Sequence, residues 1–213
     1  MNYILEALMW LRELGSNSPE NIRAVVDDIA QQSPGLRQAH AEALDRSGSA
    51  FALLMTSVGI PMFLAGEEFG DVHDLPHSDW RLKMTDPIDF ERVKLPGHEA
   101  LRARVRELSR LRVCHSALHT RGVEFVHFHP TIDENDGLRV FAYCRTGGHA
   151  VGQEGQVLVV VNAGSEAFAE YTMPCPWTHL QEIGAPTGAR APDPHDGYAS
   201  FALAPFQVRV FAT

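Results

Sequence analysis

Cysteine and long apolar runs are scarce in this sequence. The 213 residues contain only three cysteines, which are far apart and form no Cys-x-x-Cys pair: Cys114, Cys144 and Cys175. An odd and sparse set of this kind indicates reduced thiols and therefore a cytoplasmic setting. No apolar run approaches the about 20 residues that a membrane span needs, and no signal peptide opens the sequence. We therefore expect a cytoplasmic protein with no membrane partner.

An excess of positive charge is also missing. The chain has 18 Lys and Arg against 27 Asp and Glu, which gives a formal net charge of -9. Nucleic acids and anionic membranes need a basic face, so the composition disfavours both as partners. A neutral polymer such as a glucan is compatible with this charge. The length allows one large or two small globular domains.

Several motifs that carry chemistry are absent. There is no Gly-x-Ser-x-Gly of a serine hydrolase and no Gly-x-x-x-x-Gly-Lys-Ser/Thr that would cradle a phosphate. The dinucleotide-binding pattern Gly-x-Gly-x-x-Gly does not occur either. The sequence therefore predicts no cofactor.

A short apolar run followed by polar residues is the most informative stretch present. Residues 62–65 are entered by a Gly/Pro turn and left through Gly66, which predicts a buried strand covered on both faces. Charged side chains at the carboxyl end of a buried parallel strand are where α/β folds place their chemistry. Here they are Glu67, Glu68, Asp71, His73, Asp74, His77 and Asp79.

Helical spacing of apolar residues predicts the rest of the first half. The predicted helices cover residues 3–14, 19–32, 34–56 and 98–113. The third is either continuous or a pair broken at 47–49. In the fourth, four leucine and valine positions form the expected buried stripe, and its five arginines are expected on the solvated face: Arg102, Arg104, Arg106, Arg110 and Arg112.

Strands dominate after Gly122. Alternating apolar runs bounded by turn residues predict seven strands of an antiparallel sandwich, at 123–128, 138–143, 156–162, 168–173, 179–183, 198–203 and 206–211. Residues 156–162 are apolar on both faces and are expected to form a central strand. The domain boundary is expected near 119–122.

A family resemblance follows from these stretches. Gly-Ile-Pro-Met-Phe-Leu-Ala-Gly-Glu-Glu-Phe-Gly-Asp, at 59–71, resembles the eighth barrel strand of the α-amylase superfamily of (β/α)8 α-glucan hydrolases and transglycosidases. Residues 52–58 resemble the end of its seventh helix, and 104–118 its eighth helix with the exit into a C-terminal sandwich. The resemblance implies an α+β chain, with a partial (β/α)8 barrel, mostly helical, over 1–120 and a β-sandwich over 121–213.

The same resemblance implies missing catalytic parts. Residues 1–15 resemble the helix before the fourth barrel strand, yet no Asp-Gly-Phe-Arg-Phe-Asp motif with the nucleophile follows. The general-acid glutamate strand and the Asn-His-Asp motif are absent too. Retaining cleavage needs two carboxyl groups, so we expect a C-terminal fragment that is inactive alone. A partner chain or self-association would complete the barrel. The alternative is a non-catalytic carbohydrate-binding or interaction module.

The expected binding residues also come from the resemblance. Glu67 and Glu68 are adjacent, so on a strand they would point to opposite faces and make a poor catalytic pair. One of them is expected to pair with a nearby arginine. The polar rim of a glucan groove would comprise Glu68, Asp71, His73, Asp74 and Trp80.

A metal site is the main alternative role for these polar residues. The carboxylates and histidines from Asp71 to Asp79 could in principle bind a cation. They have no standard zinc spacing, so no metal site is expected. In the sandwich, Trp177 is interpreted as packing rather than as a sugar platform.

Overall fold

A computed structural model describes residues 34–71, 88–185 and 192–213. The expected helices at 3–14 and 19–32 lie outside the described residues. The chain divides into two compact units, one of residues 1–43 and 72–88 and one of residues 44–71 and 89–213. The second unit contains nearly all described residues. No helix of the described part is long and apolar enough to cross a membrane.

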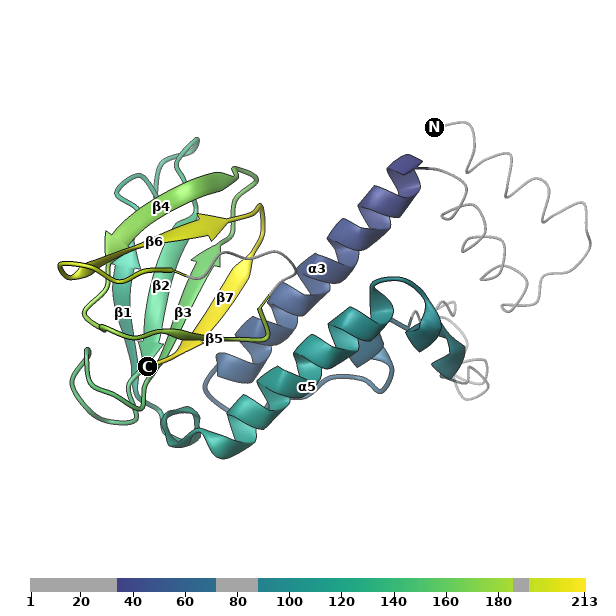
Figure 1. Cartoon of the computed structure of the whole chain (residues 1–213), viewed down its shortest axis with the longest axis horizontal. Coiled ribbons are helices and arrows are strands. Elements are labelled where there is room, and N and C mark those ends of the chain that lie inside the picture. The colour runs from purple at the N-terminus through teal and green to yellow at the C-terminus, as the bar shows by residue number, and fades with distance from the viewer. Residues whose placement is uncertain (1–33, 72–87, 186–191) are drawn as a thin grey trace, which may run out of the picture. The chain divides into compact units, whose positions relative to one another are not determined.

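Two long helices precede the strands: α3, Pro34–Thr56, and α5, His98–Cys114 (Figure 1). Helix α3 continues through Gly48, so the alternative of a broken pair is excluded. A Cβ atom added to Gly48 would lie 2.6 Å from Arg104 Nη1 of α5, and the glycine therefore allows the close approach of that side chain. Short 3-10 turns connect the elements: η1 (Glu67–Phe69), η2 (Phe90–Lys94) and η3 (Ser116–His119).

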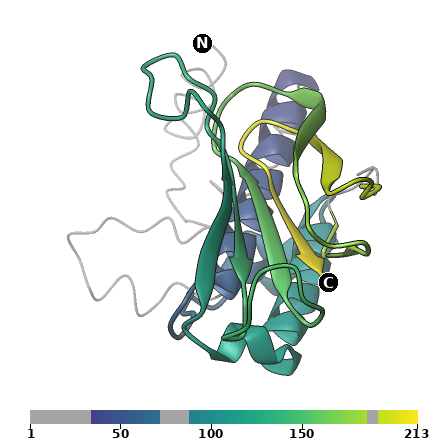
Figure 2. The same cartoon turned by 90° about the vertical axis from the view of Figure 1, so that its left-hand side faces the viewer.

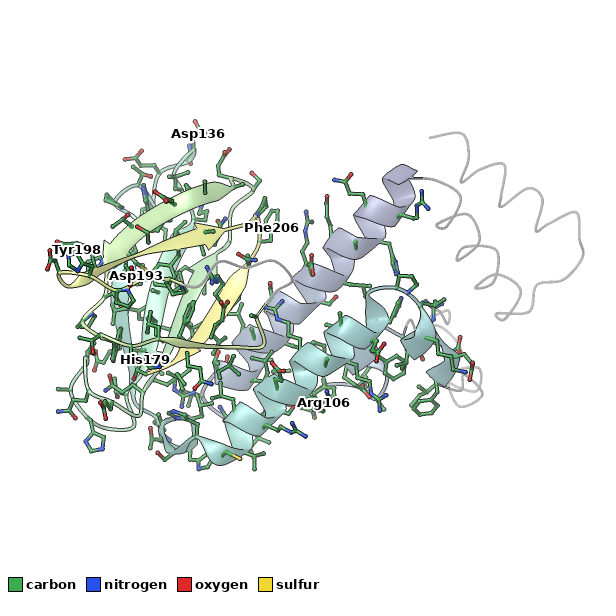
Figure 3. The ribbon with its side chains drawn as sticks, in the orientation of Figure 1. Arg106, Asp136, His179, Asp193, Tyr198 and Phe206 are labelled. Carbon is green, nitrogen blue, oxygen red and sulfur yellow. The ribbon has the colours of Figure 1, made fainter. Side chains whose placement is uncertain are left out.

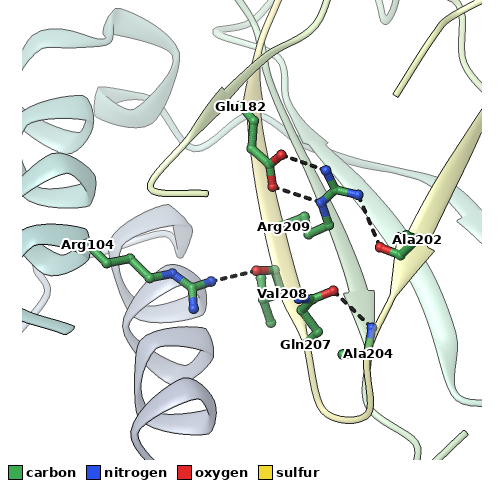
Figure 4. Close-up of polar contacts among 7 residues, drawn as sticks. All are labelled: Arg104, Glu182, Ala202, Ala204, Gln207, Val208 and Arg209. Carbon is green, nitrogen blue, oxygen red and sulfur yellow. Dashed lines mark hydrogen bonds and ion pairs between the residues drawn. The ribbon is translucent and has the colours of Figure 1, made fainter. Parts of the chain in front are cut away.

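The buried face of α5 agrees with the predicted stripe, because Leu101, Val105, Leu108 and Leu111 are all buried. The prediction that all five arginines of this helix lie on its solvated face is only partly correct. Arg104 is partly buried and donates to Val208 O of strand β7 at 2.8 Å, as Figure 4 shows. Arg112 donates to Ser57 O at 2.6 Å and to Met55 O at 3.2 Å. These two side chains bind backbone carbonyls, which a count of helical positions does not reveal.

All seven predicted strands are present, with ends that differ by up to two residues. They are β1 (Val123–Phe128), β2 (Val140–Arg145), β3 (Val157–Asn162), β4 (Phe168–Pro174), β5 (Gln181–Ile183), β6 (Tyr198–Leu203) and β7 (Val208–Ala212). A five-stranded sheet has the order β1-β2-β3-β7-β5, and β4 pairs with β6 in a second sheet. Every pairing between these strands is antiparallel.

Strand β3 lies at the centre of the larger sheet and is buried on both faces. Val157, Val159 and Val161 belong to one apolar cluster, which they share with residues of α3, α5 and β7. Leu158 and Val160 belong to a second cluster, formed with β4, β6 and the segment that carries Trp177. The prediction of a central strand that is apolar on both faces is confirmed. The five-stranded sheet is therefore covered by helices on one face and by the smaller sheet on the other (Figure 2).

Polar contacts tie the helices to the sheet. The guanidinium of Arg145, on β2, is completely buried and donates to Thr56 O, to Ser57 O at 3.0 Å, to Leu118 O at 3.2 Å and to Thr120 O at 2.6 Å. At the other side of the sheet, Arg209 and Glu182 form a bidentate pair of 2.6 and 2.8 Å (Figure 4). The joint that Arg145 forms spans the expected boundary near 120, which remains a prediction.

The predicted buried strand at 62–65 is wrong. The segment forms no strand, and its apolar side chains are largely exposed: Ile60 by 95%, Met62 by 86% and Leu64 by 64%. A strand needs an adjacent strand to bind its backbone N–H and C=O groups. Among the described residues, no strand pairs with this segment. Within the segment, Phe63 does find an aromatic neighbour, Phe51, with ring centroids 5.2 Å apart.

Candidate functional site

The polar residues after the apolar run lie on a tight turn rather than at a strand end. Gly66, with φ 99°, and Gly70, with φ 74°, bracket the η1 turn, and both values favour glycine. Phe69 is buried within the turn, and its carbonyl oxygen lies 2.6 Å from Nδ1 of buried His98 on α5. The turn is thereby anchored to the start of α5.

The two adjacent glutamates bind the backbone that precedes them. Glu67 Oε2 accepts from Leu64 N at 3.0 Å, and Glu68 Oε2 accepts from Gly66 N at 2.7 Å. Within the described part of the chain neither carboxylate forms an ion pair, so the expected arginine partner is not found for them. Both side chains act as local caps of the turn.

The arginine partner belongs to Asp71 instead. Its side chain has no exposed area; Oδ1 lies 3.3 Å from Arg92 Nε, and Oδ2 accepts from Asp89 N at 3.1 Å. The Arg92 side chain is 6% exposed. Removal of one partner from a buried pair of this kind strongly destabilises the folded protein. Asp71 therefore fastens the end of the η1 turn to η2, whatever else it binds.

The remaining residues of the expected rim lie outside the described residues: His73, Asp74 and Trp80. Their role as substrate-binding residues stays a prediction, as do the roles of Glu68 and Asp71. Among the residues that the structure describes, no group of three His, Cys, Asp or Glu side chains is placed to hold a metal ion.

Three ring side chains of the sandwich, those of Trp177, His127 and Tyr171, have structural partners. Trp177 is buried, and its Nε1 donates to Gln153 O and to Gln156 Oε1, each at 3.1 Å, so its interpretation as a packing residue is confirmed. His127 Nε2 lies 2.7 Å from Tyr171 Oη. Burial raises the pKa of Tyr171 to about 12 and lowers the pKa of His127.

A polar hollow that sequence reasoning missed lies at one end of the sandwich. It encloses about 360 Å³ between the β1–β2 connection and the β3–β4 connection. Figure 3 labels Asp136 at this end of the molecule. The sequence shows Asp133 to Gly137 only as a polar turn. The second wall comes from residues 162–168, and no local pattern indicates that the two segments meet.

Comparison with known proteins shows similarity in structure alone. No protein-family model matches the chain, and no curated protein matches its sequence. A solved structure of GBS pullulanase SAP in complex with maltotetraose aligns with 87% of this chain and 30% of its own, at 17% identity and a TM-score of 0.58. A pullulanase from Paenibacillus barengoltzii aligns with 85% of this chain and 26% of its own, at 22% identity and a TM-score of 0.56. AmyP E221Q in complex with maltotriose aligns with 79% and 34%, at 17% identity and a TM-score of 0.54.

These similarities establish the fold and its extent. Two of these proteins are pullulanases and one is AmyP, and the resemblance found in the sequence is confirmed at the level of fold. The chain spans between 26% and 34% of the length of these solved chains. The matched fold is an α+β arrangement of helices and antiparallel sheets, and the partial barrel is not confirmed.

Proposed function

We propose that this chain, which has the fold of part of an α-amylase superfamily enzyme, is the C-terminal part of an α-glucan-active glycoside hydrolase or transglycosidase. The observation that supports this most directly is the structural match to pullulanases over most of the chain. The ligands in two of the similar structures are maltotriose and maltotetraose, which makes an α-glucan the proposed ligand class.

The chain contributes binding and support rather than bond cleavage. Retaining cleavage needs a protonated acid and an ionised nucleophile about 5 Å apart. The carboxylates of the η1 region do not form such a pair, since Glu67 and Glu68 cap the turn and Asp71 is buried against Arg92. Alone, the chain is inactive on α-glucans.

The proposed glucan contacts follow the η1 turn. The Asp71–Arg92 pair fixes the point where the predicted rim begins, and Glu68 lies one turn before it. Beyond Asp71 the rim continues with His73, Asp74 and Trp80. Histidine and carboxylate side chains suit sugar hydroxyls, and an indole ring suits the apolar face of a sugar.

A further polypeptide chain covers the exposed apolar segment at residues 60–64. Ile60, Met62 and Leu64 present apolar side chains in a segment that has no strand partner among the described residues, and an exposed apolar patch of this kind marks an interaction site. The similar solved chains are about three to four times as long as the part that this chain matches. The partner is a chain that supplies the missing barrel strands, or a second copy. The reduced thiols fit a cytoplasmic location for that assembly.

Affinity electrophoresis of the full chain through gels with and without amylopectin tests the glucan assignment. We expect retarded migration in amylopectin, reduced in Trp80→Ala but not in Tyr198→Ala, which removes an exposed aromatic ring of the sandwich. No retardation of the wild-type chain would overturn the proposal. Reducing-sugar release above a buffer blank that disappears in Glu68→Gln would show that the chemistry is misplaced.

The alternative is a non-catalytic carbohydrate-binding or interaction module. The observation in its favour is that the described carboxylates of the η1 region all serve the fold. Activity that appears when a chain carrying the missing strands is added would favour the enzyme fragment. Glucan binding by a stable monomer that gains no activity when such a chain is added would favour the module.

A further inference from the structure

The hollow at the end of the sandwich has the size of a small ligand site. Its volume of about 360 Å³ lies at the lower end of the range of ligand pockets, which is about 300–1,000 Å³. One wall carries Asn135, Asp136 and Leu138, and the opposite wall carries Glu166 and Phe168.

The wall formed by the β1–β2 connection is fixed before any ligand arrives. Arg139 donates to the carbonyl oxygens of Ile132, of Glu134 at 2.7 Å and of Asn135 at 3.3 Å. Leu138 N donates to Thr131 Oγ1 at 3.1 Å. The guanidinium is thus occupied by carbonyl groups of its own loop.

The opposite wall is fixed by Asn162, which is buried at the end of β3. Its side-chain amide donates to Glu166 O at 2.7 Å and to Ala204 O at 2.8 Å, and its Oδ1 accepts from Gly164 N at 3.0 Å. Ala163 N donates to Arg139 O at 2.8 Å, which joins the two walls. A preformed site of this kind loses little entropy on binding.

The side chains of the hollow that are available to bind a ligand are mostly neutral or negatively charged hydrogen-bonding groups. Within the described part of the chain, the side chains of Asn135, Asp136, Ser165 and Glu166 form no hydrogen bond to the protein. Two carboxylates disfavour an anionic ligand. Phe168 is half-buried and offers an apolar surface beside them. A neutral molecule with hydroxyl groups on its edge and C–H groups on its face matches this lining.

We infer that the hollow is a second carbohydrate site, which takes one or two units of a gluco-oligosaccharide. The sugar hydroxyls donate to Asp136 and Glu166, and one ring face contacts Phe168. The inference rests on the proposed function for the ligand class, but it concerns the sandwich and not the rim from Glu68 to Trp80.

Titration of the full ¹⁵N-labelled chain with maltotriose tests the site. We expect saturable chemical-shift changes at the amides of Gly137 and Gly164, one on each wall. The double variant Asp136→Ala/Glu166→Ala should raise the Kd measured at these amides at least tenfold. The matched double variant Asp193→Ala/Glu154→Ala removes the same charge from exposed positions outside the hollow and should leave it unchanged.

A second variant separates loss of binding from loss of fold. Ser165 is exposed on the rim of the hollow, so Ser165→Trp should block the site while the melting temperature stays unchanged. Shifts confined to residues 66–71, or an unchanged Kd in both hollow variants, would overturn this inference and leave the proposed function intact. No maltotriose binding in the titration and no retardation in amylopectin would overturn both. Shifts produced by CaCl2 but not by maltotriose would identify a cation site and overturn the inference as well.

Discussion

Two short apolar runs of this chain differ sharply in how far they are buried. Val157 to Val161, in β3, are between 0% and 2% exposed, whereas Ile60, Met62 and Leu64 are between 64% and 95% exposed. Strand β3 has β2 and β7 on its two edges and an apolar cluster on each face. The 60–64 segment has no such strand neighbours among the described residues. An apolar run therefore favours burial, but it is buried only where other segments of the chain pack against it.

The largest expected effect comes from a charge on the central strand. Val159→Asp places a carboxylate at a fully buried position of the cluster shared with α3 and α5. An unpaired buried charge costs several kcal/mol against a total stability of about 5–15 kcal/mol, so the variant should be unfolded. Thermal unfolding followed by circular dichroism measures this. Leu64→Asp is the matched change in the exposed run and should melt like the wild type; equal behaviour of the two variants would contradict the comparison.

Loss of the Arg145 guanidinium should be next in size. Its replacement in Arg145→Met removes a buried donor from four carbonyl oxygens of the helix–sheet joint, of which Ser57 O keeps its contact with Arg112. We expect a loss of about 3–5 kcal/mol in the free energy of unfolding, the range found when one partner of a buried charged contact is removed. Urea denaturation measures it. Arg106→Met, on the exposed face of α5 (Figure 3), serves as the control and should change stability little.

A smaller loss is expected where the exposed run ends. Asp71→Asn keeps an acceptor for Asp89 N but removes the charge that faces Arg92. The loss should be about 2 kcal/mol, as for a hydrogen bond to a charged group. Urea denaturation of this variant and of Glu99→Gln, which lies exposed in the first turn of α5, gives the difference. An unchanged midpoint for Asp71→Asn would show that the buried pair does not hold the turn.

Substitution of the exposed run should alter association without altering stability. If the run binds a second copy or a partner chain, Met62→Ser/Leu64→Ser should lower the molar mass seen by sedimentation and leave the melting temperature within about 1 °C, since surface changes are small. Val58→Ser/Phe90→Ser changes two exposed apolar residues outside 60–64 and should keep the association. A wild-type chain that stays monomeric at all concentrations and binds no chain carrying the missing barrel strands would contradict the proposed association through residues 60–64.

The smallest effect concerns pH. Burial, and then the neighbouring His129, lowers the pKa of His127 in the folded protein below its unfolded value. The unfolded chain then binds more protons at this histidine on acidification. The contribution of His127 to stability is therefore constant above the unfolded pKa of about 6.5 and falls as pH decreases below it. Melting temperatures at pH 7 and pH 5 should differ less in His127→Asn than in the wild type. His179→Asn, at an exposed position, should keep the full difference. A steeper fall in His127→Asn would contradict the sign of this effect.

Much of this fold is predictable from local pattern. Strand β3 and the buried stripe of α5 follow from the alternation and helical spacing of apolar residues, and the two faces of β3 follow from period two alone. The antiparallel turn at 133–137 follows from its polar and glycine residues. These features depend on residues that are close in sequence, so the sequence determined them by itself.

Other features depend on partners that lie far away along the chain, and only the tertiary structure decided them. Arg104 and Arg145 bind carbonyl oxygens that are up to 104 positions distant in sequence, so helical or strand position does not reveal their burial. Asp71 rather than Glu67 or Glu68 pairs with an arginine, because the two glutamates bind the backbone N–H groups of Leu64 and Gly66. The hollow of the sandwich forms where two loops meet. Apolar and helical patterns show which residues should face a core, because they depend on neighbours in the sequence. Ion pairs, burial and the hollow depend on contacts with distant segments of the chain.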